Sequence, residues 1–409
     1  DRYGNRVDDA GRPFRQGMVF RCTRDGRGFE VLGWNFRNPY EVAVDSFGGL
    51  WQSDNDDDGH RATRVTFVME YGNYGFVDER TGAGWQAPRT NIEPEIPDRH
   101  WHQHDPGVVP NLLVTGNGSP AGLCVYEAAL LPGRFHGAVI HCDAGPRVLR
   151  AYRVAPHGAG YRAESETLVD GAVDAWFRPV DVCTAPDGSL LVADWHDPGV
   201  GGHAMADTEK GRIYRVAATG SGWTVPAVGF GTPPAAVAAL ASPNLCTRAT
   251  ALEALASWPA AALRELASAR AGTVDPRLRA RLAWAASTLP GCPPELPETL
   301  AAETDEMQVV AVRMQRFMQG DVLGLVERLA ASPSAAVRRE CAVALRGVTG
   351  PRADRAWAKL AARHEAGDRW DVEALGIGAD CVAGFGETDA WDGRLAAWLE
   401  TAGDRWRSP

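Results

Sequence analysis

The sequence lacks the short motifs that identify several large enzyme classes. Its eight cysteines are scattered, without the Cys-x-x-Cys spacing of zinc ribbons and thioredoxins or the Cys-x-x-Cys-His motif that attaches haem. A Gly-x-Ser-x-Gly elbow, a phosphate loop and a dinucleotide fingerprint are absent as well. These absences argue against serine-hydrolase, nucleotide-binding and thiol-redox chemistry. Isolated cysteines usually serve as small buried apolar side chains.

Positive charge and long apolar runs are also scarce. The formal net charge is -10, which argues against nucleic acid or an anionic membrane surface as the main partner. No apolar run approaches the roughly 18 residues of a membrane span, and no signal peptide opens the chain. The first residue is Asp1 rather than methionine, which is typical of a processed or truncated product.

The composition divides the chain into two parts. With 409 residues and 45% hydrophobic content, the chain is long enough for two domains with real cores. Residues 1–225 contain short runs of strand character separated by turns, residues 226–241 are a linker rich in proline and alanine, and residues 242–409 have helical spacing. The strand runs expected in the first part are 17–23, 29–34, 40–44, 64–69, 123–127, 138–142, 148–154, 190–193 and 212–216.

An internal repeat indicates the architecture of the first part. The segment from Pro39 to Asp54 matches that from Pro179 to Asp194, and a looser copy runs from Pro120 to Asp143. Each copy predicts a strand, a turn and a returning strand, and repeated hairpins at this spacing favour a β-propeller over a sandwich. The residues before each repeat should then share a rim with the aspartates that end it.

Only about three propeller blades can be counted, whereas a propeller needs at least four. We therefore expect a partial propeller, completed by another polypeptide that is either an upstream segment or a partner chain, because bare sheet edges recruit other strands.

The second part repeats too. Related segments begin near residues 247, 278, 309, 337 and 368, and Pro243, Pro276 and Pro333 are expected to open three of the helices. Helix pairs stacked at this period predict an α-helical HEAT-like solenoid. A plain helical bundle is the alternative.

An acidic turn is the first candidate for a metal site. Asp54, Asp56 and Asp58 alternate and are closed by Gly59, as at the start of a calcium loop. Val65 stands where an EF-hand needs its closing glutamate, so the turn is no EF-hand. The sequence predicts calcium at these three carboxylates, with a solvated acidic turn as the alternative.

Histidines and tryptophans provide further candidates. His102, His104 and Asp105 are compatible with a metal site, although the same residues could tie down a long loop through hydrogen bonds. Exposed tryptophans could stack on a sugar or wedge between blades, and the candidates are Trp85, Trp101 and Trp195.

Several stretches of the first part together resemble a known family. Asn38-Pro39, Asp45, Gly49-Leu50-Trp51, the acidic turn and the segment 71–76 resemble the glucose/sorbosone dehydrogenase propellers, which use pyrroloquinoline quinone (PQQ). The segments 100–111, 141–146 and 193–203 are more similar to the membrane-bound dehydrogenase family of planctomycetes and verrucomicrobia. That family joins such a propeller to HEAT repeats and often to a cytochrome c domain.

The resemblance implies a cofactor site and a location. Arg178, in a stretch similar to the one that holds the quinone carboxylates, would bind PQQ together with Asn38, Asn73 and Tyr74, and calcium would lie at the acidic turn. Phe177 replaces the family's first arginine, and the blade that carries the catalytic histidine is absent, so the catalytic residue is unknown. The resemblance also implies a periplasmic or otherwise extracytoplasmic protein with a cytochrome c as electron acceptor.

Two functions therefore stay open. One is a PQQ-type sugar or alcohol dehydrogenase, incomplete in this chain, and the other is a non-catalytic module that binds carbohydrate or partner proteins.

Overall fold

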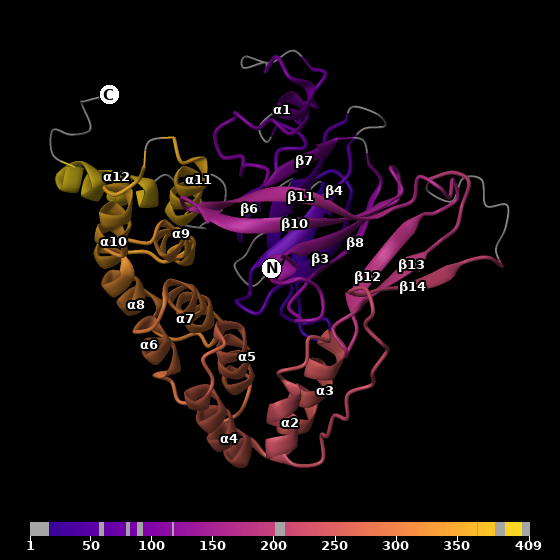
Figure 1. The fold of residues 1–409 in the computed structure, drawn as a ribbon. Helices are drawn as coiled ribbons and strands as arrows, with labels where there is room; N and C mark the ends of the chain where they lie inside the picture. The colour runs from indigo at the N-terminus through magenta and orange to yellow at the C-terminus, as the bar shows by residue number, and fades with distance from the viewer. Residues whose placement is uncertain are drawn as a thin grey trace.

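A computed structural model describes residues 16–56, 61–78, 82–87, 93–116, 118–200, 209–365, 367–380 and 389–402. Strands occupy the first part of the chain and helices the second (Figure 1). Across these ranges the molecule is a mixed β and α structure with several small sheets and without a closed barrel. No helix in them is long and apolar enough to cross a membrane.

The strands form four sheets. Two have four strands, in the orders β3-β4-β5-β7 and β8-β9-β10-β11, and two have three, in the orders β1-β2-β6 and β12-β13-β14. Neighbours are antiparallel except β2 and β6. The bounds are β1 (Gly17–Arg21), β2 (Glu30–Phe36), β3 (Pro39–Val44), β4 (Leu50–Asp54), β5 (Thr63–Phe67), β6 (Gly72–Asn73), β7 (Leu113–Gly116), β8 (Pro120–Val125), β9 (Val139–Asp143), β10 (Val148–His157), β11 (Gly160–Asp170), β12 (Pro179–Thr184), β13 (Leu190–Asp194) and β14 (Arg212–Val216).

The hairpin prediction for the repeat is confirmed. The proline that opens each copy pairs with the aspartate that closes it, in the pairs Pro39–Asp54, Pro120–Asp143 and Pro179–Asp194. All nine expected strand runs overlap a strand, whereas β6, β7 and β11 were not expected. The opening strands of the three copies lie side by side, with β3 against β8 and β8 against β12.

Two short helices interrupt the strands, α1 (Ile96–His100) and a 3-10 turn at Gly133–Phe135. The second part consists of α2 (Pro233–Ala239), α3 (Leu245–Leu255), α4 (Pro259–Gly272), α5 (Pro276–Ser287), α6 (Leu296–Ala301), α7 (Asp305–Phe317), α8 (Val322–Leu329), α9 (Ala335–Ala344), α10 (Pro351–Ala361), α11 (Arg369–Ala379) and α12 (Asp389–Ala402). Pro276 opens α5 as expected, because its fixed φ suits a first helical turn. Pro243 and Pro333 instead lie two residues before their helices, which Leu245 and Ala335 begin.

The helices form an arc along one side of the sheets (Figure 1). Alternate helices each place an arginine on the strand part. The contacts join Arg248 of α3 and Arg281 of α5 to Glu127, Arg316 of α7 to Glu70, Arg339 of α9 to the Ala159 carbonyl and Arg369 of α11 to the Val108 carbonyl. A shared apolar core, with Phe67 and Val65 on one side and Val310 and Trp370 on the other, continues across this boundary. The two parts therefore pack as one body.

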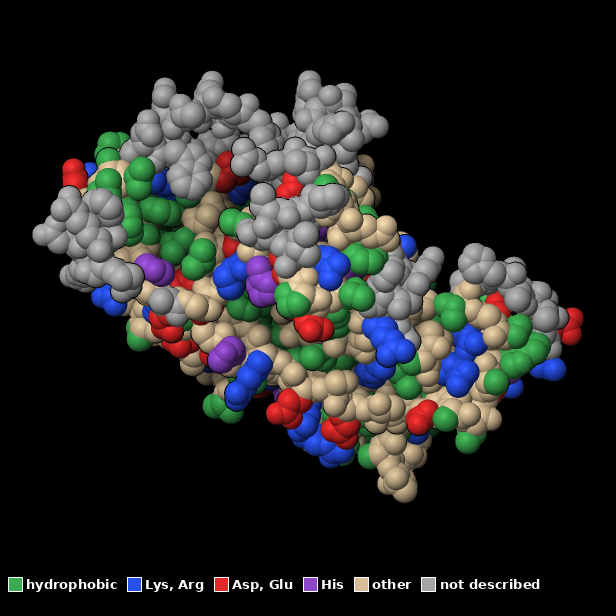
Figure 2. Space-filling model, turned by 90° about the horizontal axis from the view of Figure 1, so that it is seen from above, with side chains coloured by type: hydrophobic (Ala, Val, Ile, Leu, Met, Phe, Trp, Pro, Cys, Tyr) green, Lys and Arg blue, Asp and Glu red, His purple; other side chains and the backbone are tan. Residues whose placement is uncertain are grey.

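Acidic and basic side chains are interspersed on the upper face of the molecule (Figure 2). No large basic patch is visible there among the residues drawn in colour.

Candidate functional site

The rim predicted from the repeat is built around its three closing aspartates. Asp54, Asp143 and Asp194 are all buried. Each carboxylate accepts a hydrogen bond from the backbone N–H of the residue that precedes the paired strand. The N···O distances are 2.7 Å from Asn38 to Asp54, 2.8 Å from Ser119 to Asp143 and 2.8 Å from Arg178 to Asp194. The repeated aspartate thus holds the start of each opening strand.

Each closing aspartate also has an arginine partner on the third strand of its sheet. The N···O distances are 2.8 Å for Arg64–Asp54, 2.7 Å for Arg150–Asp143 and 3.6 Å for Arg212–Asp194. These arginines were not predicted, although each follows its aspartate within 18 residues and could have been aligned as part of the repeat. Burial raises the pKa of Asp143 to about 6, against the opposing effect of the Ser119 N–H and Arg150.

The pair at Asp54 is the most deeply buried of the three. Neither side chain of the Arg64–Asp54 pair is exposed to solvent. The Arg64 guanidinium lies 3.6 Å from the centre of the Trp101 ring and donates to the Tyr74 carbonyl. Trp101 is also fully buried, and its Nε1–H donates to the Ala62 carbonyl. Trp101 is therefore part of the core and not a sugar-stacking surface.

The acidic turn is only partly described by the structure. Asp54 is engaged as above, and Asp56 is buried with its Oδ2 accepting from the Ala62 N–H at 2.9 Å. Asp58 and Gly59 lie outside the described residues. In the ranges that are described, no group of three histidine, cysteine or acidic residues is placed to hold a metal. Calcium at this turn stays a prediction.

The two candidate histidines have different environments. His102 is buried, has a φ of 51°, and its Nδ1 lies 2.7 Å from the Gly75 carbonyl oxygen. His104 is exposed, and its Nε2 lies 3.8 Å from Asp98. The structure therefore does not bring these imidazoles together at one point. The geometry of His102 matches the alternative interpretation, in which it ties down the loop.

The residues expected to bind PQQ make contacts within the chain. The Arg178 side chain is buried and donates to the carbonyls of Phe177, Pro198 and Gly199 at 2.9–3.0 Å. Tyr74 is fully buried, stacks on Phe36 and hydrogen-bonds through its hydroxyl to the Phe67 carbonyl.

The other two expected PQQ residues are Asn73, which directly precedes Tyr74, and Asn38, whose backbone N–H donates to Asp54. The Asn73 Oδ1 accepts from the Asn35 Nδ2 and the Gly75 N–H, while Asn38 is exposed. Binding of PQQ by these four residues stays a prediction.

The loop after β13 carries the other rim residues. The Arg212 Nη1 lies 3.1 Å from the His196 Nδ1, and His196 has a φ of 54°. Trp195 is half exposed, and its Nε1–H donates to the buried Asp197 at 3.3 Å. The described part of this loop is therefore held by hydrogen bonds and presents the half-exposed indole of Trp195.

A second group of acids lies on the opening strands. Glu41 of β3 and Asp181 of β12 occupy equivalent repeat positions, and oxygens of both lie within 3 Å of the point where a Cβ on Gly122 would stand. Burial raises the pKa of Glu41, and the charge of Asp181 contributes to the rise. Gly122 is required here because a side chain would collide with both carboxylates. The shared repeat position was the signal in the sequence.

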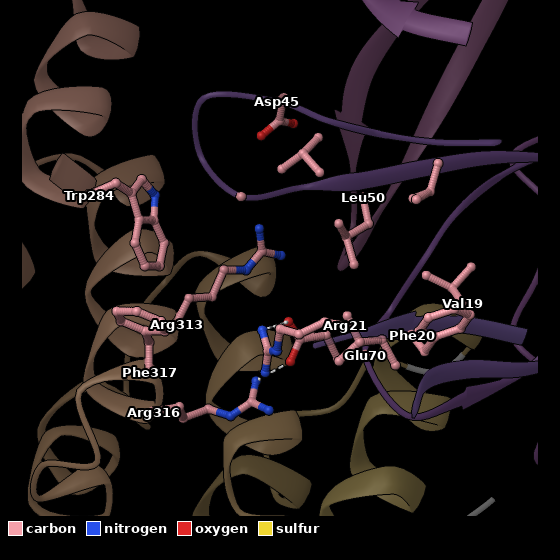
Figure 3. Close-up of a pocket in the computed structure, with 14 residues that line it drawn as sticks. Val19, Phe20, Arg21, Asp45, Leu50, Glu70, Trp284, Arg313, Arg316 and Phe317 are labelled. Carbon is pink, nitrogen blue, oxygen red and sulfur yellow. Dashed lines mark ion pairs between the residues drawn. The ribbon is translucent and has the colours of Figure 1, made fainter. Parts of the chain in front are cut away.

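A cavity of about 370 Å³ lies between the strand part and the helices (Figure 3). Its wall is mostly apolar, with Trp284 and Phe317 from the helices facing Val42, Val44 and Leu50 from the sheet. Charged groups at one side are Arg21, Glu70, Arg313 and Arg316.

The carboxylate of Glu70 interacts with the arginines that line this cavity. Its carboxylate lies 2.7 Å from Arg316 and 3.7 Å from Arg21. Burial would raise the pKa of Glu70, but Arg316, Arg21 and Arg313 together lower it to about 2. None of these residues was predicted from the sequence, because their contact depends on how α7 packs on β1.

Comparisons with known proteins place the first part in a family. A family model described as "Domain of unknown function (DUF7133)" matches residues 6–220. No curated protein matches the chain.

Several solved structures are similar in part. A glucose dehydrogenase from Thermus thermophilus is 18% identical with a TM-score of 0.33, covering 46% of this chain and 47% of that chain. The PQQ-bound aldose sugar dehydrogenase of Streptomyces coelicolor is 18% identical with a TM-score of 0.34, covering 49% and 51%. The soluble aldose sugar dehydrogenase of Escherichia coli, in its apo form, is 15% identical with a TM-score of 0.30, covering 40% and 44%. The matches span about half the length of these structures.

Proposed function

The chain belongs to the family described as "Domain of unknown function (DUF7133)", and from this premise we propose that it is the scaffold portion of a sugar-dehydrogenase-type β-propeller. One observation carries the proposal: the rim groups that would act in catalysis or cofactor binding hold the chain's own strands. The three closing aspartates are engaged by backbone N–H groups and arginines, and Arg178 is engaged by carbonyls.

The hydrogen bonds of the Arg178 guanidinium give the most specific support for the scaffold proposal. Arginine recognises a carboxylate through two parallel N–H donors of its planar guanidinium. In this chain Nε, Nη1 and Nη2 each donate to a carbonyl of the surrounding loop, and the side chain is buried. Three of its five N–H donors are thus used by the chain itself, which leaves one hydrogen on each of Nη1 and Nη2 for any other acceptor. Arg178 is therefore suited to hold the loop that carries Trp195 and His196.

The helical part fits the same role. Arginines from alternate helices bind carboxylates and carbonyls of the strand part, and the apolar core is continuous across the boundary. We infer a HEAT-like arrangement whose inner face is occupied by the chain's own sheets.

A second candidate is the complete dehydrogenase. The acidic turn beside Asp54 favours it, because its remaining carboxylates are the ligands that calcium prefers. If the protein is a complete dehydrogenase, another polypeptide completes the propeller and carries the catalytic residue. PQQ and calcium then bind to the completed assembly, and a cytochrome c accepts the electrons outside the cytoplasm. Carbohydrate would be the substrate in this case and a bound ligand in the scaffold case.

The two functions are separated by an assay of the purified chain with PQQ, calcium and a panel of aldoses. For the scaffold we expect no reduction of an artificial electron acceptor and no saturable binding of PQQ by fluorescence. Arg178→Ala should lower the melting temperature through loss of its loop contacts. Arg27→Ala, at an exposed arginine, is the matched control. Sugar oxidation by the chain alone, lost in Arg178→Lys although the variant melts normally, would overturn the scaffold proposal.

A further inference from the structure

One arginine at the rim has no partner within the described part of the chain. Arg147 lies in the turn between β9 and β10, directly before Val148, which pairs with the closing aspartate Asp143. Its Nε–H is buried without an acceptor, and no hydrogen bond or ion pair among the described residues engages its guanidinium. A guanidinium withdrawn from water normally has a partner, so the donors of Arg147 are available to an acceptor that is not part of the described chain.

The backbone of Arg147 is held in an unusual conformation. Its φ is 62°, in the left-handed region that residues other than glycine seldom adopt. The turn is fixed by a hydrogen bond of 2.9 Å from the Gly171 N–H to the Arg147 carbonyl. Strained residues of this kind persist where the surrounding structure imposes them, and they are frequent at binding sites.

The neighbouring segment brings a second guanidinium to the same place. A Cβ on Gly171 would touch both the Cβ of Arg147 and the ring of Phe177, so the turn packs on the residue that precedes Arg178. The Arg178 Nη1 in turn donates to the Phe177 carbonyl at 2.9 Å. Burial and, after it, the positive charge of Arg147 lower the pKa of Arg178, as expected for two cations close to each other. An anion placed between the two guanidinium groups would relieve this repulsion.

An exposed indole borders these arginines. The Trp195 backbone N–H donates to the Arg178 carbonyl at 2.9 Å, and the Trp195 residue is 52% exposed. Its Nε1–H is already bound to Asp197 at 3.3 Å, so the apolar faces of the ring are what it offers to a ligand. A flat apolar face beside charged donors suits a molecule that has both an apolar face and polar groups, as a sugar ring does.

The surrounding charges limit the charge of the ligand. Asp197, Asp194 and Asp174 all act to raise the pKa of Arg178, so their negative charges offset part of the positive charge at this end of the rim. A single negative charge is therefore favoured over a doubly charged phosphate. A carboxylate also matches the planar guanidinium, which can donate two parallel hydrogen bonds to its oxygens.

We propose that Arg147, together with Arg178 and Trp195, forms a binding site for an acidic sugar such as a hexuronate. The carboxylate accepts hydrogen bonds from the Arg147 guanidinium and from the free hydrogens on Nη1 and Nη2 of Arg178, and the sugar ring stacks on the indole of Trp195. This inference rests on the proposed function and deepens it, since it names the class of carbohydrate that the scaffold binds.

Isothermal titration of the full chain with glucuronate, and with glucose as the neutral sugar of the same ring, tests the site. We expect saturable binding of glucuronate and at least about tenfold weaker binding of glucose, because hydrogen bonds to charged groups are lost. Arg147→Met should reduce the affinity for glucuronate to that for glucose, and Arg147→Lys should give an intermediate value because it keeps the charge without the planar fork.

Two further variants complete the design. Trp195→Ala should weaken the binding of both sugars, because the stacking surface serves the ring and not the carboxylate. Arg27→Met is the matched control, since the Arg27 side chain is 86% exposed in the turn between β1 and β2, and it should leave binding unchanged. Circular dichroism and melting of each variant check that it folds.

Several results would overturn the inference. These are the absence of saturable glucuronate binding, equal affinity for glucuronate and glucose, or unchanged affinity in a folded Arg147→Met variant. Acetate binding as tightly as glucuronate would show that the sugar ring is not recognised. PQQ binding that depends on Arg147, without binding of glucuronate, would assign the site to a quinone. Binding is measured without PQQ or an electron acceptor, so failure here leaves the sugar-oxidation assay and the melting of Arg178→Ala to decide the proposed function.

Discussion

Replacing Arg64 by methionine tests whether the rim aspartates are structural. The variant removes the cation that faces Asp54 and keeps an apolar side chain against Trp101, whose ring centre lies 3.6 Å from the guanidinium. Asp54 would keep its hydrogen bonds from the backbone N–H groups of Arg37 and Asn38 but would become an uncompensated buried charge. Removing one partner of such a pair costs about 3–5 kcal/mol of the free energy of unfolding.

The experiment is urea unfolding at neutral pH, followed by tryptophan fluorescence and by circular dichroism. We expect a clear fall in the midpoint for Arg64→Met and partial recovery in the double variant Arg64→Met/Asp54→Asn, because the second change removes the unpaired charge. Arg134→Met is the matched control, since its ion pair with Glu166 is solvent-exposed and should leave the midpoint nearly unchanged.

Two outcomes would refute the reasoning. If Arg64→Met shifted the midpoint no more than Arg134→Met, the Asp54 pair would not be a desolvated structural pair. If calcium raised the wild-type midpoint and Asp54→Asn abolished that rise, Asp54 would be a calcium ligand. It would then not serve mainly to hold the start of β3.

Three further predictions concern pH and metal. Glu70→Gln should lose on the order of 3 kcal/mol of stability above pH 4.5, because the pKa of Glu70 is about 2 in the folded chain. The difference in free energy of unfolding between the variant and wild type should disappear as the pH falls from 4.5 toward 2. A difference that does not change with pH would show that the arginines around Glu70 do not lower its pKa. Burial lowers the pKa of His141 to about 3, so wild type should lose stability as the pH falls below 6.5. In acid titrations of the melting temperature, His141→Phe should show a weaker dependence on pH. Parallel curves for the two proteins would show that His141 does not cause the loss. If the acidic turn binds calcium, chelator should lower the melting temperature of wild type but not of Asp56→Asn; an equal response of both proteins would remove Asp56 from the site.

The local elements of the fold were predictable from the sequence. Strand alternation, turn residues and a proline-to-aspartate repeat act over a few residues, and they located the hairpins and the pairing of Pro39 with Asp54. The spacing of helix-opening residues likewise located α5 at Pro276. Three strands were not predicted because their own sequence signals are weak. β6 has only two residues. β11 is an outer strand with several exposed charged residues, and β7 has only four residues and follows a long loop.

The roles of the candidate site residues were decided by tertiary structure. An aspartate at the end of a strand has the same local sequence whether it binds calcium, faces solvent or holds a neighbouring strand. Which of these occurs depends on what comes within about 3 Å of its oxygens, and for Asp54 that is Arg64 from the next strand. Likewise, Arg178 could not be distinguished from a cofactor-binding arginine until the carbonyls of Pro198 and Gly199 were placed against it.

Tertiary structure also determined the cavity and the exposed face of β3. Val42 and Val182 have the same place in the repeat, and their sequences predict the same burial. One is covered and the other is exposed because burial depends on which sheet packs above a residue, and that sheet is made from other parts of the chain or from another chain. The sequence by itself therefore determined the strands and their pairs, while the packing of one sheet on the next determined which of their side chains are free to act.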